Sequence, residues 1–256
     1  MSTVLEGILA QTRATLEQRR AAQPLGDVAP RAGARTFAAA LAQPTIAVIA
    51  EFKRRSPSAG ALAEQPVLED VVAAYTKGGA AALSILTEEA NFAGTLGDLR
   101  AARALTALPL LRKDFVVERY QLEEAVLAGA DAVLLIVAAL DDGTLGGLLG
   151  AAEELNLDVI VEVHDADELA RAAAVGAPII GVNNRDLRDF SVDVRRTEEL
   201  LSGVPPATLV VSESGIGDAA QVKRLQAAGV DAVLVGEALM RSGNAQRTLS
   251  ELLRGI

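Results

Sequence analysis

Short apolar runs alternate with amphipathic segments along most of the chain. From Ile46 onward there are eight such runs, and each is separated from the next by room for a helix. Near-continuous apolar runs are typical of parallel strands that are buried on both faces. The alternation predicts an α/β fold, either a closed barrel or a doubly wound sheet. The expected strands are residues 46–52, 81–86, 109–112, 132–136, 159–163, 179–182, 209–212 and 232–235.

A recurring glycine favours the barrel. Four segments share a glycine that would end a helix and that directly precedes a strand, at Gly79, Gly129, Gly176 and Gly229. These glycines are 50, 47 and 53 residues apart, so each step holds two strand–helix units and marks every second strand of eight. Glycine ends helices in any α/β protein, but a fourfold recurrence fits a closed ring better than an open sheet. With a length of 256 residues, the pattern predicts a (β/α)8 TIM barrel.

The N-terminal segment has a different pattern. Apolar residues recur at helical spacing from Thr3 to Ala22, a loop with Pro and Gly covers 21–33, and a short helix is expected over Arg35–Ala42. We expect one domain over residues 1–256, with an N-terminal helical extension at 1–44 and the barrel at 45–256. Residues 1–10 lack a signal-peptide pattern and no apolar stretch reaches membrane-spanning length. A cytoplasmic protein is therefore expected, and a monomer is our expectation for its assembly.

Composition narrows the chemistry. The net charge of −10 argues against nucleic acid or an anionic membrane as a partner. There is no cysteine and one histidine, so thiolate catalysis is excluded and neither a Ser-His-Asp triad nor a multi-histidine metal site is expected. Acid–base work then falls to Lys, Glu and Asp. Few of the 24 basic residues are lysines, which favours roles that arginine cannot fill at Lys53, Lys77, Lys113 and Lys223.

Polar side chains stand at the strand ends, where barrel enzymes keep their catalytic groups. Glu51 and Lys53 end the first strand and point to the same face. Lys113 ends the third strand, where burial and a neighbouring cation would lower its pKa and make it a general acid or a Schiff-base lysine. A surface lysine paired with Asp114 is the other interpretation. Glu162 interrupts the apolar fifth strand and indicates either catalysis or a structural ion pair, because a buried carboxylate is costly unless it is paired.

Other polar positions are less specific. Arg54 and Arg55 are expected in a solvated turn, and His164 is expected at the rim of the barrel. After the sixth strand, Asn183 could orient a substrate hydroxyl and Arg185 could grip a carboxylate, although Asn-Asn-Arg-Asp is also an ordinary turn. Glycine-bearing loops follow the last two strands, where barrels commonly bind phosphate. The expected phosphate ligands are Ser214, Gly215, Gly236 and Glu237, the last through its N–H with its carboxylate turned away.

Taken in order, these segments resemble the indole-3-glycerol phosphate synthase family. The N-terminal helix also fits, since this family extends its barrel at that end. One departure is Asn-Phe-Ala-Gly at 91–94, where the family more commonly has Gly-Gly. The resemblance covers the chain from 46 to 240, in the segments IAEFKRRSPS (49–58), SILTEEANFAG (84–94), LRKDF (111–115), ADAVLLI (130–136), VEVH (161–164), GVNNRDL (181–187), SESGI (212–216) and LVGEALM (234–240).

The resemblance implies a reaction and a set of roles. The substrate would be 1-(2-carboxyphenylamino)-1-deoxyribulose 5-phosphate, which closes to indole-3-glycerol phosphate with loss of CO2 and water and without metal or cofactor. Lys113 would be the general acid at ring closure, and Glu162 and Lys53 would assist proton transfers. Substrate hydroxyls and Lys113 would be held by Glu51 and Asn183. Phosphate would meet Lys53, Ser214, Gly215, Gly236 and Glu237, and the anthranilate end would meet Ser56, Pro57, Phe92, Phe115, Leu134, Arg185 and Leu187.

Two alternatives stay open at this point. Another phosphosugar barrel enzyme, such as an aldolase with a Schiff base on Lys113, would need a similar strand-end lysine and similar glycine loops. A catalytically silent protein that binds a phosphorylated metabolite would be expected to keep the loops but lose Lys113 or Glu162. Both of those residues are present.

Overall fold

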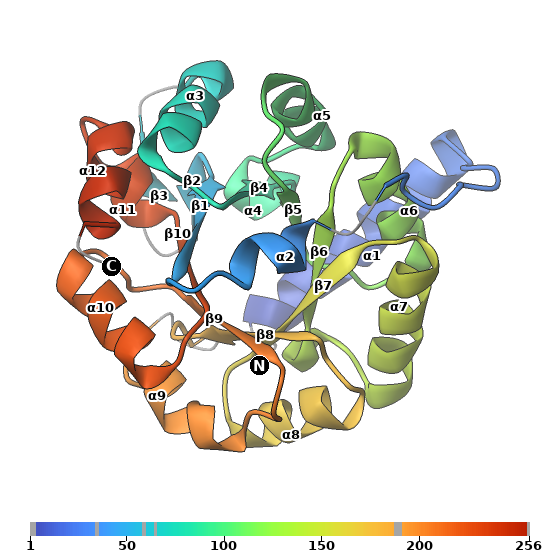
Figure 1. Cartoon of the computed structure of the whole chain (residues 1–256). Coiled ribbons are helices and arrows are strands. Elements are labelled where there is room, and N and C mark those ends of the chain that lie inside the picture. The colour runs from blue at the N-terminus through green and yellow to red at the C-terminus, as the bar shows by residue number, and fades with distance from the viewer. Residues whose placement is uncertain (1–3, 34–35, 58–59, 64–65, 187–190, 255–256) are drawn as a thin grey trace.

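Eight parallel strands form a closed barrel, which confirms the predicted fold (Figure 1). The computed structural model describes residues 4–33, 36–57, 60–63, 66–186 and 191–254. Neighbouring strands follow the order β1-β10-β9-β8-β7-β6-β5-β4 around the ring. Every predicted strand is present, with ends that differ from the prediction by at most one residue. The strands are β1 (Ala47–Phe52), β4 (Ala82–Leu86), β5 (Leu110–Lys113), β6 (Ala132–Ile136), β7 (Asp158–Val163), β8 (Ile179–Asn183), β9 (Leu209–Glu213) and β10 (Ala232–Val235).

The barrel strands are buried on both faces because helices cover the outside and side chains fill the inside. Two aspartates in the repeated Gly-x-Asp-Ala pattern also join neighbouring strands. Asp131 accepts a hydrogen bond from the backbone N of Leu110 at 2.8 Å, and Asp231 accepts one from Val210 at 2.7 Å. Each aspartate precedes one strand and caps the start of the strand beside it. The repeat in the sequence therefore reflects a strand-pairing device as well as a helix end.

Helices surround the ring, and glycine ends many of them as predicted. Gly79, Gly129 and Gly229 have φ values of 97°, 85° and 96°, and Gly176 has 72°, all in the left-handed region that suits glycine at a helix C-terminus. The helices of the barrel part are α3 (Leu68–Gly78), α4 (Glu89–Phe92), α5 (Leu96–Leu105), α6 (Arg119–Ala128), α7 (Asp142–Glu154), α8 (Ala166–Ala174), α9 (Arg196–Leu200), α10 (Ala219–Ala228), α11 (Glu237–Met240) and α12 (Ala245–Leu252), with 3-10 turns η1 (Val137–Ala139) and η2 (Leu201–Gly203).

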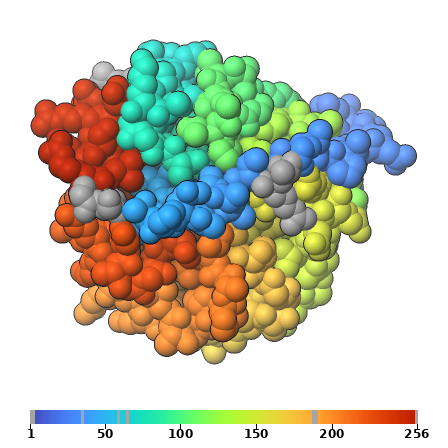
Figure 2. Space-filling model, viewed as in Figure 1, coloured from blue at the N-terminus to red at the C-terminus, as the bar shows by residue number. Residues whose placement is uncertain are grey.

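The N-terminal extension has two helices, α1 (Val4–Ala22) and α2 (Phe37–Leu41), as expected, although Thr3 and Arg35 lie outside the described residues. Helix α2 lies across the amino-terminal end of the barrel, where it crosses the middle of the molecule in Figures 1 and 2. Its Phe37 and Leu41 are fully buried, and the backbone N of Ala38 donates to Asp158 at the start of β7. Helix α2 thus covers the end of the barrel opposite to the expected active site.

A small hairpin was not predicted. Strands β2 (Arg55–Ser56) and β3 (Gly60–Ala61) pair antiparallel in the segment that follows β1. Two-residue strands carry no hydrophobic period, so the sequence pattern gives no signal for them. Within the described part of the chain, no helix is both long and apolar enough to cross a membrane.

Candidate active site

A single cavity at the carboxyl ends of the strands brings the predicted polar residues together. Its volume is about 520 Å³. Leu187 lies outside the described residues. All the other candidate residues line the cavity, namely Glu51, Lys53, Ser56, Pro57, Phe92, Lys113, Phe115, Leu134, Glu162, Asn183, Arg185, Ser214, Gly215, Gly236 and Glu237.

Two lysines and three carboxylates form a charged cluster at the floor of this cavity. The Nζ of Lys113 lies 2.9 Å from Oε2 of Glu162 and 3.2 Å from Oε2 of Glu213. The Nζ of Lys53 lies 2.6 Å from Oε1 of Glu51. Strand alternation explains the grouping, because each side chain ends its strand on the inward face. The two ammonium groups therefore each have carboxylate partners.

The protonation of Lys113 differs from the expectation. Burial alone would lower its pKa, but the carboxylates of Glu162, Glu213 and Glu51 outweigh burial, and the pKa of Lys113 is raised. The predicted lowering was wrong because it considered Lys53 as the nearest charge. Lys113 is thus a protonated ammonium that can donate a proton, and not a neutral amine ready to attack a carbonyl.

The two carboxylates that share Lys113 have opposite pKa shifts. Burial opposes ionisation of Glu162, but Lys113, His164 and Asn183 favour its charged form and the pKa is lowered. Burial dominates at Glu213, with repulsion from Glu162 and Glu51, and raises its pKa to about 7. Apart from the Lys113 ammonium, no described residue donates a hydrogen bond to either oxygen of Glu213. At neutral pH, Glu162 is ionised while Glu213 is poised between its acid and base forms.

Glu213 was missed in the sequence analysis. The predicted seventh strand ended at Ser212, one residue short of the observed end of β9. A carboxylate within one residue of a buried apolar run is the same signal that identified Glu162, so the sequence could have pointed to it. Space for this side chain comes from Gly181 on β8, where a methyl group would collide with the Glu213 carboxylate. Gly236 leaves room for Glu51 in the same way.

Asn183 holds Glu162 and does not contact Lys113. Its Nδ2 donates to Oε1 of Glu162 at 3.1 Å, and its Oδ1 accepts from the backbone N of Arg185 at 3.0 Å. Glu51 in turn accepts from the hydroxyl of Ser84 at 3.4 Å. The resemblance implied that Glu51 and Asn183 hold Lys113, but its ion-pair partners are Glu162 and Glu213, with Glu51 acting on it through charge alone.

Backbone turns after β9 and β10 form the other end of the cavity. Ser214 and Gly215 have φ values of 66° and 79°, so two consecutive residues are left-handed, and Gly236 precedes the N-terminus of α11. Turns of this kind point backbone N–H groups at one place and suit an anion. The carboxylate of Glu237 faces the guanidinium groups of Arg241 at 3.2 Å and Arg185 at 3.5 Å. Arg185 therefore reaches the phosphate side of the cavity.

The opposite wall is apolar. The rings of Phe92 and Phe115 are 6.4 Å apart and tilted by 42°. Leu134 and Pro57 extend this wall as predicted. The wall also includes Leu86, Ile136 and Ile216, which the sequence analysis did not single out. A flat aromatic group fits such a wall.

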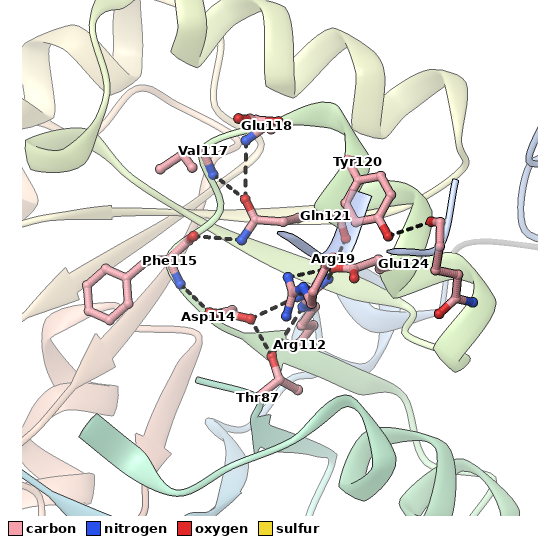
Figure 3. A network of polar contacts seen from close by, with 11 residues as sticks. Arg19, Thr87, Arg112, Asp114, Phe115, Val117, Glu118, Tyr120, Gln121 and Glu124 are labelled. Carbon is pink, nitrogen blue, oxygen red and sulfur yellow. Dashed lines mark hydrogen bonds and ion pairs between the residues drawn. The ribbon is translucent and has the colours of Figure 1, made fainter. Parts of the chain in front are cut away.

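A buried arginine anchors the strand that carries Lys113. Arg112 is fully buried, and its guanidinium group lies among Thr87, Asp114 and Glu124 (Figure 3). Its Nε donates to Oγ1 of Thr87 at 3.1 Å and its Nη2 donates to Asp114 at 2.8 Å, while both Nη atoms also face Glu124 at 3.3 Å. Asp114 in turn accepts from the backbone N of Phe115. This network fixes the segment that presents both Lys113 and Phe115 to the cavity.

Arg54 and Arg55 donate hydrogen bonds to a distant part of the chain. Arg54 makes a two-pronged contact with Asp98, 2.7 Å at each oxygen, and donates to the carbonyl of Ala93 at 3.0 Å. Arg55 donates to the carbonyls of Asn91 and Ala90. Arg55 is exposed, as expected of a solvated turn, whereas Arg54 is half-buried, and the acceptors of both lie more than 30 residues away in the sequence. Together the two arginines tie the segment after β1 to the loop that carries Phe92.

No group of three or more His, Asp or Glu side chains among the described residues is arranged to hold a metal ion. Lys113 and Lys53 already neutralise the carboxylates that face the cavity.

Comparison with known sequences gives a consistent family. The family model described as Indole-3-glycerol phosphate synthase matches residues 5–252. Indole-3-glycerol phosphate synthase 2 of Streptomyces coelicolor is 46% identical, with 99% of this chain and 100% of that protein covered. The indole-3-glycerol phosphate synthases of Micrococcus luteus and Rhodococcus jostii are 46% and 44% identical, over 96% and 98% of this chain and 96% and 95% of those proteins.

Solved structures with low sequence identity share the barrel alone. Thiamine phosphate pyrophosphorylase from Pyrococcus furiosus has a TM-score of 0.61 at 20% identity, covering 86% of this chain and 96% of that one. A mutant tryptophan synthase alpha-subunit from the same organism has a TM-score of 0.63 at 14% identity, covering 82% and 98%. These similarities support the fold and carry no conclusion about the substrate.

Proposed function

The chain belongs to the indole-3-glycerol phosphate synthase family, and from that premise we propose how its own residues carry out the reaction. The enzyme is a carboxy-lyase of tryptophan biosynthesis. It closes 1-(2-carboxyphenylamino)-1-deoxyribulose 5-phosphate to indole-3-glycerol phosphate, with loss of CO2 and then of water. The ring carbon that bears the carboxylate attacks the ribulose carbonyl. The observation that carries the proposal is the pair of contacts from Lys113 to Glu162 and Glu213 inside one cavity.

The substrate binds across the cavity with its phosphate at the turns after β9 and β10. The left-handed backbone at Ser214 and Gly215 and the N-terminus after Gly236 support this orientation. Lys53 contributes a positive charge from the first strand. The anthranilate ring then lies against the apolar wall of Ser56, Pro57, Phe92, Phe115 and Leu134, with Leu187 proposed beside it. Arg185 binds the carboxylate, for which it exchanges part of its contact with Glu237.

Lys113 is the general acid of ring closure. It protonates the carbonyl oxygen as the new carbon–carbon bond forms, and its raised pKa ensures that it carries the proton at neutral pH. Glu162 and Glu213 pair with the ammonium before the reaction. The same raised pKa argues against an aldolase mechanism, because a Schiff base requires a neutral amine.

Glu162 is the base of the dehydration step. It accepts a proton from the intermediate, since its lowered pKa keeps it ionised. Glu213, with a pKa of about 7, donates the proton that leaves with the hydroxyl as water, and Lys53 assists these transfers. Two carboxylates with opposite shifts can thus serve one acid and one base role. Asn183 and Glu51 orient the substrate hydroxyls.

Turnover measurements with single variants test these roles. Formation of the indole product is followed by fluorescence, with Lys113→Ala and Glu162→Gln compared with wild type. We expect kcat to fall about 10²–10⁴-fold in each, as for loss of a positioned acid or base. Lys223→Ala, on the outer helix α10, is the matched control and should keep wild-type turnover. Undiminished turnover in Lys113→Ala would refute the general-acid assignment.

We also propose that the chain works as a single-domain monomer in the cytoplasm. The large hydrophobic residues exposed among the described residues are Val4, Val67, Leu105, Leu127 and Val192, each on a different element or loop. Scattered positions of this kind do not make the continuous apolar patch that a stable interface needs. A phosphorylated substrate is charged and stays in the compartment where it is made. Light scattering with size exclusion tests the monomer.

A further inference from the structure

The only histidine of the chain lies between two carboxylates. The Nδ1 of His164 is 3.0 Å from Oε2 of Glu168, and its Nε2 is 3.4 Å from Oε1 of Glu162. Its side chain is 10% exposed. His164 lies directly after the end of β7, at the rim of the barrel as expected, and Glu168 of α8 contacts its imidazole. The arrangement is carboxylate, imidazole, carboxylate, with the inner carboxylate in the active site.

Contacts with the backbone hold Glu168 in place in addition to its contact with the imidazole. Its Oε2 also accepts a hydrogen bond from the backbone N of His164 at 2.8 Å. Its own backbone N donates to Asp165, the N-cap of α8, at 2.9 Å. The start of the helix thus holds Glu168 in place, and Glu168 in turn fixes the ring of His164. These contacts alone would give His164 a structural role only. The second nitrogen of its ring, however, faces Glu162 in the active site.

The imidazole is charged in this position. A proton on Nδ1 satisfies Glu168, and a lone pair on Nε2 would repel Glu162, so both nitrogens carry protons. Burial opposes the charge, but Glu162 and Glu168 outweigh it and raise the pKa of His164 to about 10. Beyond Glu162, the charged groups that face this cluster are Lys113 from β5, Glu213 from β9 and Glu51 from β1.

We propose that His164, held by Glu168, is a positioning residue that keeps Glu162 ionised and directed at Lys113. This inference rests on the proposed role of Glu162 as the base. Glu213 and Glu51 repel a negative charge on Glu162, and a substrate with a phosphate and a carboxylate adds to that repulsion. Lys113 offsets it only until it gives up its proton at ring closure. His164 is then the cation that remains beside Glu162 for the dehydration step.

The pH dependence of kcat/KM tests this role. Loss of the imidazolium should raise the pKa of Glu162, so the acidic limb of the profile should move upward, by about one unit. His164→Ala should also lower kcat about tenfold, with KM within about twofold of wild type. His164→Gln offers Glu162 a neutral N–H, so we expect part of kcat to recover while the acidic limb stays displaced. Glu168→Gln, which does not touch Glu162, should show the same displacement to a smaller degree.

Two controls separate this role from a structural one. Asp141→Ala removes the N-cap of the neighbouring helix α7 and should lower Tm without moving the profile. An acidic limb at the wild-type pH in His164→Gln and in Glu168→Gln would overturn the inference. Turnover in Glu162→Gln separates the two proposals: an active variant refutes the base role itself. If Glu162→Gln is inactive but the His164 variants keep the pH profile of the wild type, only the inference about His164 is refuted.

Discussion

At the scale of single residues, the cavity shows how neighbours decide the protonation of similar groups. Glu162 lies near the end of β7 and Glu213 ends β9, with β8 between them; both are almost fully buried and both face Lys113. Glu162 also accepts a hydrogen bond from Asn183 and lies 3.4 Å from the Nε2 of His164, whereas Glu213 contacts only Lys113 among the donors of the described residues. The difference in partners, and not in burial, therefore separates their pKa values.

The raised pKa of Glu213 predicts a pH-dependent cost in stability. In the unfolded chain the carboxyl titrates near 4.5, and in the folded protein near 7. Its contribution to stability is therefore fully present below about pH 4.5 and is lost as pH rises through 7. Glu213→Gln removes this dependence, so its Tm relative to wild type should be higher at pH 8 than at pH 5. Thermal unfolding across this range is the measurement, and a constant difference in Tm would contradict the prediction.

At the scale of elements, loops as well as strands hold side chains of the cavity in fixed positions. The loop between β4 and α5 presents Phe92 and is tied down by Arg54 and Arg55. Within it, Ala93 has a φ of 55°, a left-handed conformation that glycine adopts without steric cost. The loop therefore holds this conformation with a residue whose Cβ makes it less favourable than glycine.

The strained backbone at Ala93 predicts that glycine stabilises the protein at position 93 but destabilises it at the nearby position 90. Ala93→Gly should stabilise the protein by about 0.5–1 kcal/mol, because the Cβ clash disappears. Ala90→Gly, in helix α4 of the same loop, should destabilise it by about the same amount, because glycine is unfavourable within a helix. Urea unfolding of the two variants and wild type decides the matter. A loss of stability in Ala93→Gly would show that its backbone is not strained.

Elements were predicted from the sequence far better than contacts between them. The eight strands appeared within one residue because apolar runs and glycine helix ends are local signals. The partners of Arg112 are Thr87, Gln121 and Glu124, and those of Arg54 are Ala93 and Asp98, which only the fold brings near. The wrong prediction for the pKa of Lys113 has the same origin. Its sign depends on three carboxylates from three other strands.

At the scale of the whole molecule, the two ends of the barrel have separate tasks. At the amino-terminal end, Asp131 is buried and binds Arg31 at 3.2 Å and Arg103 at 3.0 Å, which links the N-terminal extension to the barrel. At the carboxyl-terminal end, the Arg112 network supports Lys113 and Phe115. Separate polar networks thus serve the fold at one end and the chemistry at the other.

A matched pair of variants tests this division. Asp131→Asn weakens the amino-terminal network, and Thr87→Val removes the hydroxyl that joins Arg112 to Asp114. Each should cost about 1–3 kcal/mol of stability, since each leaves a buried polar partner unsatisfied. Only Thr87→Val should also lower kcat. Denaturant unfolding and initial rates, measured below the unfolding transition, distinguish them, and an equal loss of kcat in both would refute the division.

The two glycines that leave room for carboxylates have a consequence for redesign of this barrel. Gly181 and Gly236 act through the absence of a methyl group, so alanine at either position would force Glu213 or Glu51 to move. The catalytic acids could therefore be repositioned without mutating them. For an engineer seeking a different reaction in the same scaffold, these neighbouring backbone sites are steric levers. They would shift a functional group by about an ångström while its chemical identity stays intact.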